Sequence, residues 1–105
     1  MSRDLHPTDG ARFLLEREAE LDGGRQARYR VSVYTPADVA STTVVLTDDG
    51  DVALADGAVA LAEPHWATML TFAKLTARSV PKRRDDELPP WPARVLRWRG
   101  PGRGN

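Results

Sequence analysis

His65 stands two residues after Glu63, and a histidine beside a carboxylate can transfer protons as a general acid and base. The only other histidine is His6, near the N-terminus. The sequence contains no cysteine, glycine-rich phosphate loop, nucleophile elbow or metal-ligand spacing that would complete a catalytic site. The alternative interpretation makes His65 a solvent-facing residue in the first turn of a helix. We therefore expect a protein that is not an enzyme, with no catalytic residue and no cofactor.

Three carboxylates are close together at Asp48, Asp49 and Asp51, which resembles the beginning of a calcium loop. An EF-hand also needs a later glutamate at a fixed spacing and a helix on each side. β-Branched residues precede this cluster instead, and Asp49-Gly50 is typical of a two-residue hairpin turn. The pattern predicts a turn between two strands and no metal site.

Arginine alternates with tryptophan near the C-terminus, where Trp98 stands among Arg94, Arg97 and Arg99. Phosphate contacts from arginine and base stacking on an aromatic ring can together bind single-stranded nucleic acid, with Tyr34 as a second aromatic on an exposed strand. The same residue types are enriched where proteins bind one another. The net charge is zero, which argues against strong binding to nucleic acid. Nucleic acid is therefore the second of two candidate partner classes.

Residues 89–94 read Pro-Pro-Trp-Pro-Ala-Arg and match the P-x-x-P-x-R pattern that SH3 domains bind as a polyproline helix. The alternative is a stiff connector whose Trp91 packs on its own domain, because an indole of this size is seldom left in water. We favour the connector but keep Trp91 among the candidate interface residues. The candidate binding residues are thus Trp91, Arg94, Arg97, Trp98, Arg99 and Tyr34.

The elements that must position these residues begin with a β-hairpin over residues 12–34. We place a three-residue loop at 22–24, with Gly24 in the left-handed conformation. The register that this loop sets puts apolar residues on one face of the hairpin and charged residues on the other. A one-residue slip would mix the two sets. The register makes the pairs Leu21–Arg25, Ala19–Ala27, Arg17–Tyr29, Leu15–Val31 and Phe13–Val33 on one face, and Glu18–Arg28 and Glu16–Arg30 on the other.

A helix is the competing interpretation of residues 14–21, because they are strong helix formers. Thr8 or Asp9 would begin that helix and Gly23 would end it. We favour the hairpin, since one register sorts both faces and residues 29–34 have clear β character.

A second hairpin follows, with a strand over residues 41–47 and a return after the Asp49-Gly50 turn. Its expected register leaves both faces apolar, so that each face needs a cover. A short fifth strand is expected over residues 58–62. The expected pairs are Thr47–Val52, Leu46–Ala53, Val45–Leu54 and Val44–Ala55.

One helix is expected to begin at Glu63-Pro64 and to end at Pro81, with Lys82, Arg83 and Arg84 just beyond it. Its apolar stripe contains Trp66, Met69, Leu70, Ala73 and Ala77. Residues 88–92 must be extended because of their prolines, and residues 94–99 alternate as an edge strand with Leu96 and Trp98 on one side.

The expected fold is α+β: an antiparallel meander of four or five strands, one amphipathic helix on one face, and an extended Pro/Trp-rich C-terminal arm. We expect a disordered N-terminus at residues 1–10, a single domain at 11–99 whose arm is 81–99, and a flexible tail at 100–105. The predicted core is Phe13, Leu15, Val31, Val33, Val44, Leu46, Leu54, Trp66, Met69, Leu70 and Ala73.

Composition limits the remaining choices. At 105 residues the chain is one domain, and no apolar run reaches the ~20 residues of a membrane helix. We expect a cytoplasmic protein, with a composition typical of GC-rich bacterial genomes. Residues 1–77 carry seven basic and twelve acidic side chains, whereas residues 78–105 carry eight basic and three acidic ones. The leading hypothesis is a non-catalytic module that binds another protein or itself as a homodimer.

Overall fold

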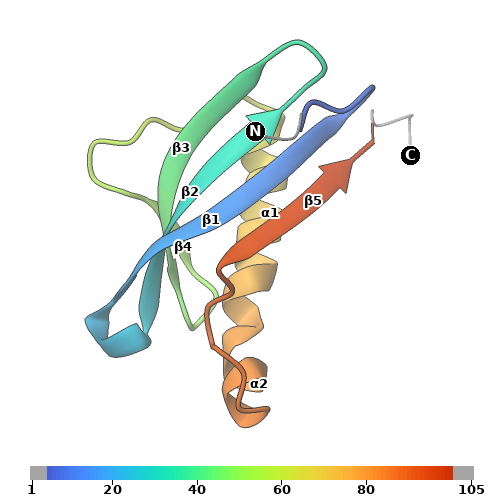
Figure 1. Ribbon diagram of the computed structural model, residues 1–105. Coiled ribbons are helices and arrows are strands. Elements are labelled where there is room, and N and C mark those ends of the chain that lie inside the picture. Colours follow the sequence, from blue (N-terminus) through green and yellow to red (C-terminus); the bar gives the residue numbers. More distant parts are fainter. Residues whose placement is uncertain (1–4, 101–105) are drawn as a thin grey trace.

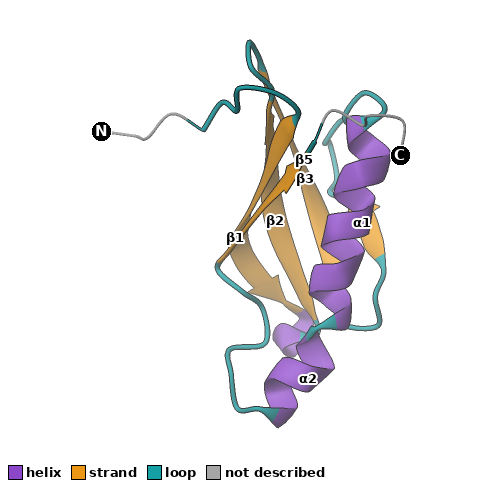
Figure 2. Ribbon diagram, turned by 90° about the vertical axis from the view of Figure 1, so that its right-hand side faces the viewer, coloured by secondary structure: helices purple, strands orange, loops and turns teal. Residues whose placement is uncertain are grey.

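The computed structural model describes residues 5–100, and Figure 1 follows their elements along the chain. Five strands and two helices are joined by short connections, with a short 3-10 turn at Asp22–Gly24 between the first two strands. Figure 2 shows the sheet as one layer and both helices on one side of it. The elements are β1 (Ala11–Leu21), β2 (Gln26–Tyr34), β3 (Val39–Thr47), β4 (Val52–Leu54), α1 (His65–Arg78), α2 (Val80–Asp85) and β5 (Arg94–Arg99).

All neighbouring strands are antiparallel, in the order β4-β3-β2-β1-β5. The α+β meander is therefore confirmed, and β1 is a strand and not the competing helix. Strand β5 pairs with β1, so the last strand of the chain is one edge of the sheet and β4 is the other.

The first hairpin has the expected register only as far as Arg17, which lies opposite Tyr29. A bulge then shifts the pairing by one residue, so that Ala19 lies opposite Arg28 and not Ala27. The loop is one residue longer than predicted, because Leu21 pairs with Gln26. The bulge absorbs that residue and keeps the ion pair between Arg28 and Glu18, whose Nε and Oε1 atoms are 3.2 Å apart.

The second hairpin differs more from the expectation. Leu46 lies opposite Val52, one residue away from the predicted pairing, because the turn extends from the N–H of Thr47 to the carbonyl of Asp51. The shift places Val52 and Leu54 on the same face as the buried Val44 and Leu46. The outer face of this hairpin then carries Thr43, Val45 and Ala53, so it is less apolar than the predicted register made it. The predicted strand at 58–62 does not form.

The helical segment bends and does not end at Pro81. Helix α1 stops at Arg78, and α2 begins at Val80 with Pro81 in its first turn, where a missing N–H is tolerated. Lys82, Arg83 and Arg84 thus belong to α2, and residues 81–85 are helical and not part of an extended arm. No helix within residues 5–100 is long and apolar enough to cross a membrane.

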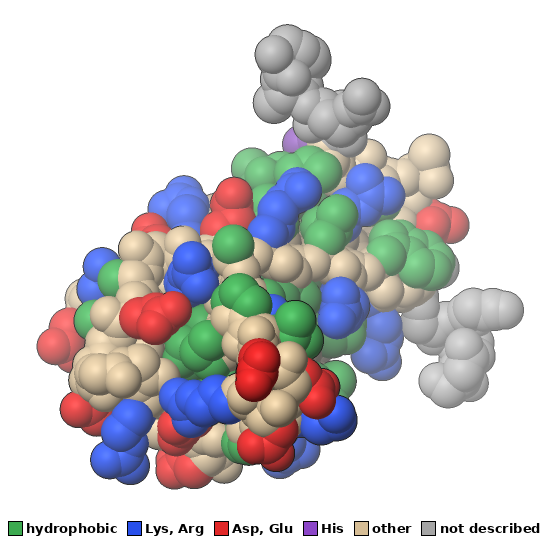
Figure 3. All heavy atoms as spheres, turned by 60° about the horizontal axis from the view of Figure 1, so that its bottom comes forward, with side chains coloured by type: hydrophobic (Ala, Val, Ile, Leu, Met, Phe, Trp, Pro, Cys, Tyr) green, Lys and Arg blue, Asp and Glu red, His purple; other side chains and the backbone are tan. Residues whose placement is uncertain are grey.

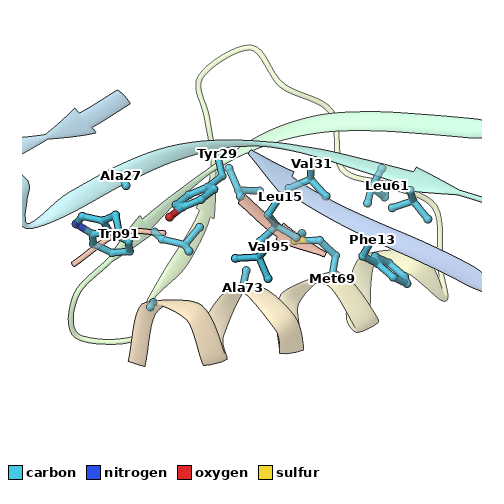
Figure 4. Packing of buried hydrophobic residues seen from close by; sticks show 14 of the residues in the cluster. Phe13, Leu15, Ala27, Tyr29, Val31, Leu61, Met69, Ala73, Trp91 and Val95 are labelled. Carbon is cyan, nitrogen blue, oxygen red and sulfur yellow. The ribbon is translucent and has the colours of Figure 1, made fainter. Parts of the chain in front are cut away.

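The core lies between the inner face of the sheet and α1 (Figure 4). Phe13, Leu15 and Val31 from the sheet face Met69 and Ala73 from the helix, all nearly or fully buried. Most of the predicted core is confirmed, but Leu54 is 37% exposed, and Trp66 and Leu70 are only partly buried. Trp91 and Tyr29 extend the core toward α2.

Residues 5–10, part of the segment predicted to be disordered, lie against the sheet. The Nδ1 atom of His6 lies 2.6 Å from the Thr35 carbonyl, and the indole N–H of Trp98 donates to the Asp9 carbonyl at 3.1 Å. The remainder of that prediction, residues 1–4, and the tail at 101–105 lie outside the described residues.

The buried Tyr29 should make the stability of the folded protein depend on pH in alkaline solution. Burial raises its pKa from 10.0 to about 12, against the lowering effect of the Arg17 and Arg83 charges. The folded state therefore holds the proton that the unfolded state loses, so this stabilisation is complete below pH 10 and disappears as the pH rises toward 12. We expect the free energy of unfolding to fall by roughly 1.4 kcal/mol per pH unit in this window. Urea titrations of the wild type and Tyr29→Phe would measure it. The variant should lose this slope and Tyr34→Phe should keep it; equal slopes in all three proteins would refute the assignment.

Candidate functional site: the open edge of strand β5

Trp91 is fully buried, so it cannot belong to a binding surface. Its indole N–H donates to the Gly24 carbonyl at 2.7 Å, and its ring lies 6.3 Å from that of Tyr29. The connector interpretation is confirmed, and the assignment of Trp91 as an interface residue is corrected. Because Trp91 points into the core, the proline segment around it is not presented as an SH3 ligand.

The residues after Trp91 are fastened to the sheet at three points. The Arg17 guanidinium donates to the Trp91 carbonyl at 2.6 Å, and the Arg17 N–H donates to the Ala93 carbonyl at 3.0 Å. The Tyr29 hydroxyl donates to the Pro92 carbonyl at 2.7 Å. These bonds fix the position of the chain at the start of β5 and so set the register of this strand against β1.

The register of β5 determines which of its backbone groups are open. The bond from Arg17 to Ala93 joins directly opposite residues, and in an antiparallel ladder such pairs alternate with pairs that share no hydrogen bond. The odd-numbered residues of β5 therefore bond to β1. The backbone groups of Arg94, Leu96 and Trp98 point away from the sheet, where Figure 1 shows no further strand.

One open carbonyl is used within the strand itself, since the Arg97 guanidinium donates to the Leu96 carbonyl at 3.0 Å. Charged side chains at a sheet edge hinder unwanted pairing with other strands. A partner strand that uses the Leu96 carbonyl must therefore displace this contact.

The side chains with outward backbone groups lie on the face of the sheet that the helices do not cover. Leu96 is 37% and Trp98 53% exposed. Trp98 lies opposite Arg12, which lies opposite Tyr34, so the two aromatic residues are separated by a strand. Tyr34 is half-buried with its ring edge-on to His6 at 5.3 Å. The structure thus places Tyr34 and Trp98 in one row but not in contact.

A groove of about 380 Å³ runs between β5 and α1 on the other side of the strand. Phe72 and Leu75 of α1 supply its apolar wall, and Leu75 is 57% exposed. Arg83 and Arg97 line it, Arg94 borders it although its side chain lies on the outer face of the sheet, and no carboxylate lines it. Leu75 lies off the predicted apolar stripe of the helix, and its exposed position acquires meaning only when β5 lies beside the helix.

The arginines of β5 form no close ion pair within the described residues, and of the three only Arg94 lies opposite a carboxylate, that of Glu16. Across residues 5–100 the ion pairs are Arg17–Glu20, Arg28–Glu18, Lys82–Asp86 and Arg84–Asp48, and none involves an arginine of β5. The end of the molecule that carries α2 is different, since Figure 3 shows acidic and basic side chains interspersed over it. The edge of β5 is therefore a cationic strip with apolar side chains.

The other candidate chemistry has structural explanations. The Glu63 carboxylate accepts a hydrogen bond from the Ala67 N–H at 3.0 Å and so caps α1, while the His65 ring lies edge-on to Phe13 at 6.0 Å. Asp49 accepts from the Asp51 N–H at 3.1 Å within the turn, and Asp48 pairs with Arg84 at 2.8 Å.

No protein-family model, curated protein or solved structure matches this chain. The function is accordingly argued from the geometry and charge of the β5 edge.

Proposed function

We propose that this chain is a non-catalytic protein-binding module that accepts an extended, acidic segment as an additional strand along β5. The observation that carries the proposal is an edge strand with three outward backbone positions beside a groove that three arginines border and no carboxylate lines. Backbone hydrogen bonds supply affinity in this mode of recognition, and side chains at alternate positions supply specificity.

The side chains along β5 favour a partner strand with a particular pattern. Apolar side chains opposite Leu96 and Trp98 would cover the exposed apolar surface of the outer face. Carboxylates opposite Arg97 and Arg99, on the side of the groove, would neutralise charges that the domain leaves unmatched. A segment in which apolar and acidic residues alternate satisfies both requirements.

The same arginines argue less well for nucleic acid. Glu16 lies between Arg94 and Arg30 on the outer face, and Glu18 pairs with Arg28 there. A phosphate chain crossing that face would meet these carboxylates. The Trp98 ring also lies beside Gly100, where an added Cβ atom would be 3.1 Å from the ring's Cη2 atom. Protein is therefore the preferred partner class.

A fluorescent peptide in which leucine alternates with glutamate would test the proposal by anisotropy. We expect saturable binding that Arg97→Glu weakens by about tenfold or more, because a carboxylate then faces a carboxylate. The matched control is Arg25→Glu, which changes the same charge in the exposed β1–β2 loop and should keep the wild-type affinity.

A leucine–lysine peptide and a labelled single-stranded oligonucleotide complete the experiment. The proposal expects both to bind more weakly than the acidic peptide. It would be overturned by equal binding of both peptides, by equal affinity in both variants, or by tight, salt-sensitive binding of the oligonucleotide alone.

A further inference from the structure

The opposite edge of the same sheet carries a segment of the kind that β5 requires. Residues 51–56 read Asp-Val-Ala-Leu-Ala-Asp, with apolar residues between two aspartates, and β4 lies within them. Asp51 and Asp56 are exposed and take part in no ion pair of the described chain. One sheet therefore has an acidic edge and a basic edge.

The backbone of β4 is open in the same way as that of β5. The Thr47 N–H donates to the Asp51 carbonyl and the Ala55 N–H to the Thr43 carbonyl, at 2.9 and 3.0 Å. These bonds join directly opposite residues, so odd-numbered positions bond to β3. The backbone groups of Val52 and Leu54 point away from the sheet.

An antiparallel pairing of these two edges matches side chains at four positions. Only residues whose backbone groups point away from their own sheet can hydrogen-bond across the junction, so these residues must lie opposite one another. Setting Leu54 opposite Leu96 also sets Val52 opposite Trp98. The same register sets Asp56 opposite Arg94 and Asp51 opposite Arg99. Two apolar pairs are thus flanked by an ion pair at each end, and Arg97 faces the small Ala53.

We infer that the segment bound at β5 is the β4 edge of a second copy of this chain, so that copies join head to tail. The inference rests on the proposed function and names its partner. Pairing of β5 with β5 would gather the arginines of two copies, and pairing of β4 with β4 would gather their aspartates. Like charges in apposed strands are destabilising, so the unlike edges are favoured.

The topology determines how successive copies are oriented. Strands β4 and β5 run in the same direction within one sheet, because each is antiparallel to β1 through the order β4-β3-β2-β1-β5. An antiparallel junction therefore requires the second copy to be turned over, and its helices lie on the opposite side. Because such a contact uses different surfaces on the two copies, it leaves a free edge at each end and extends with concentration.

Proline at an outward position removes one open N–H without removing a bond to the neighbouring strand. Leu96→Pro should block the β5 edge, and Leu54→Pro should block the β4 edge. In sedimentation velocity at low salt we expect the wild type to grow with concentration and each variant to remain monomeric. An equimolar mixture retains one functional edge of each kind and should form a one-to-one dimer and nothing larger.

Charge exchange gives a second test should a proline variant fail to fold. The double variants Asp51→Lys/Asp56→Lys and Arg94→Glu/Arg99→Glu change only exposed side chains. Each should be monomeric alone, and their mixture should assemble again because every edge then meets an opposite charge. High salt should disperse all these assemblies by screening the end pairs.

The outcomes separate this inference from the function on which it rests. A wild type that is monomeric at every concentration, or mixtures that never associate, would overturn head-to-tail joining. If the leucine–glutamate peptide still binds at β5 under those conditions, the protein-binding function stands with a different partner. If the peptide fails as well, both fail. Assembly of the wild type that persists in Leu96→Pro would also refute the inference.

Discussion

Replacing Trp91 by alanine is expected to lower the free energy of unfolding by about 3–5 kcal/mol, among the largest effects of any single substitution in this chain. The indole is fully buried, and its N–H satisfies the Gly24 carbonyl in the loop between β1 and β2. Truncation leaves a cavity beside Tyr29 and removes this bond, which joins two segments far apart in the sequence. Urea denaturation followed by circular dichroism measures the change.

Trp98→Ala is the matched control, since it truncates the same residue type on the same arm. Trp98 is 53% exposed, so its stability effect should stay below about 1 kcal/mol. Its effect should appear instead in the affinity for the acidic peptide, which Trp91→Phe should leave unchanged. Similar losses of stability in Trp91→Ala and Trp98→Ala would show that Trp91 does not anchor the arm.

Gly10→Ala is expected to destabilise the protein by about 3 kcal/mol through a clash combined with backbone strain. Gly10 has φ +70, and a Cβ atom there would clash with the Arg99 carbonyl oxygen. The backbone of β1 therefore cannot keep its place beside the end of β5 when a side chain is added. Peptide binding should weaken too, because the Arg99 end of the edge is displaced.

Gly23→Ala separates the two causes. Gly23 has φ +63, and no atom lies within 4 Å of its Cβ position. It should show only the strain of a left-handed alanine, roughly 1 kcal/mol, with unchanged peptide affinity. If the two alanine variants lose equal stability by urea titration, the contact between Gly10 and Arg99 plays no part in holding β5.

The first hairpin was predictable because apolar and charged residues alternate with a period of two over its whole length. Leu15 and Val31, and Glu16 and Arg30, report the same register independently. The bulge was not predictable. It accompanies a loop one residue longer than expected, in which Asp22 has φ 52, and the length of that loop depends on local backbone geometry. The predicted β3–β4 register was wrong for the same reason, because the geometry of the turn sets it. The apolar pattern does not decide the register, since Val45 and Leu54 suit either face of the sheet.

The candidate site was predictable only in part, because its meaning depends on which elements become neighbours. Arg94, Arg97, Trp98 and Arg99 were identified from their types and lie on the open edge. Trp91 resembles them in sequence, yet its burial depends on the distant Gly24 carbonyl. The groove wall at Leu75 arises from the pairing of β5 with β1, and no local pattern specifies that pairing.

The most direct test of strand addition is the exchange of single backbone amide hydrogens along β5, measured by NMR with and without the leucine–glutamate peptide. In the free Leu54→Pro variant, which keeps an open β5 edge but cannot assemble through β4, the outward amides of Leu96 and Trp98 should exchange rapidly, whereas those of Val95 and Arg97 should be protected by β1. Bound peptide should slow Leu96 and Trp98 to the rate of their neighbours. Saturating peptide that leaves both outward amides in rapid exchange would contradict the account, because the new strand would then not lie along β5.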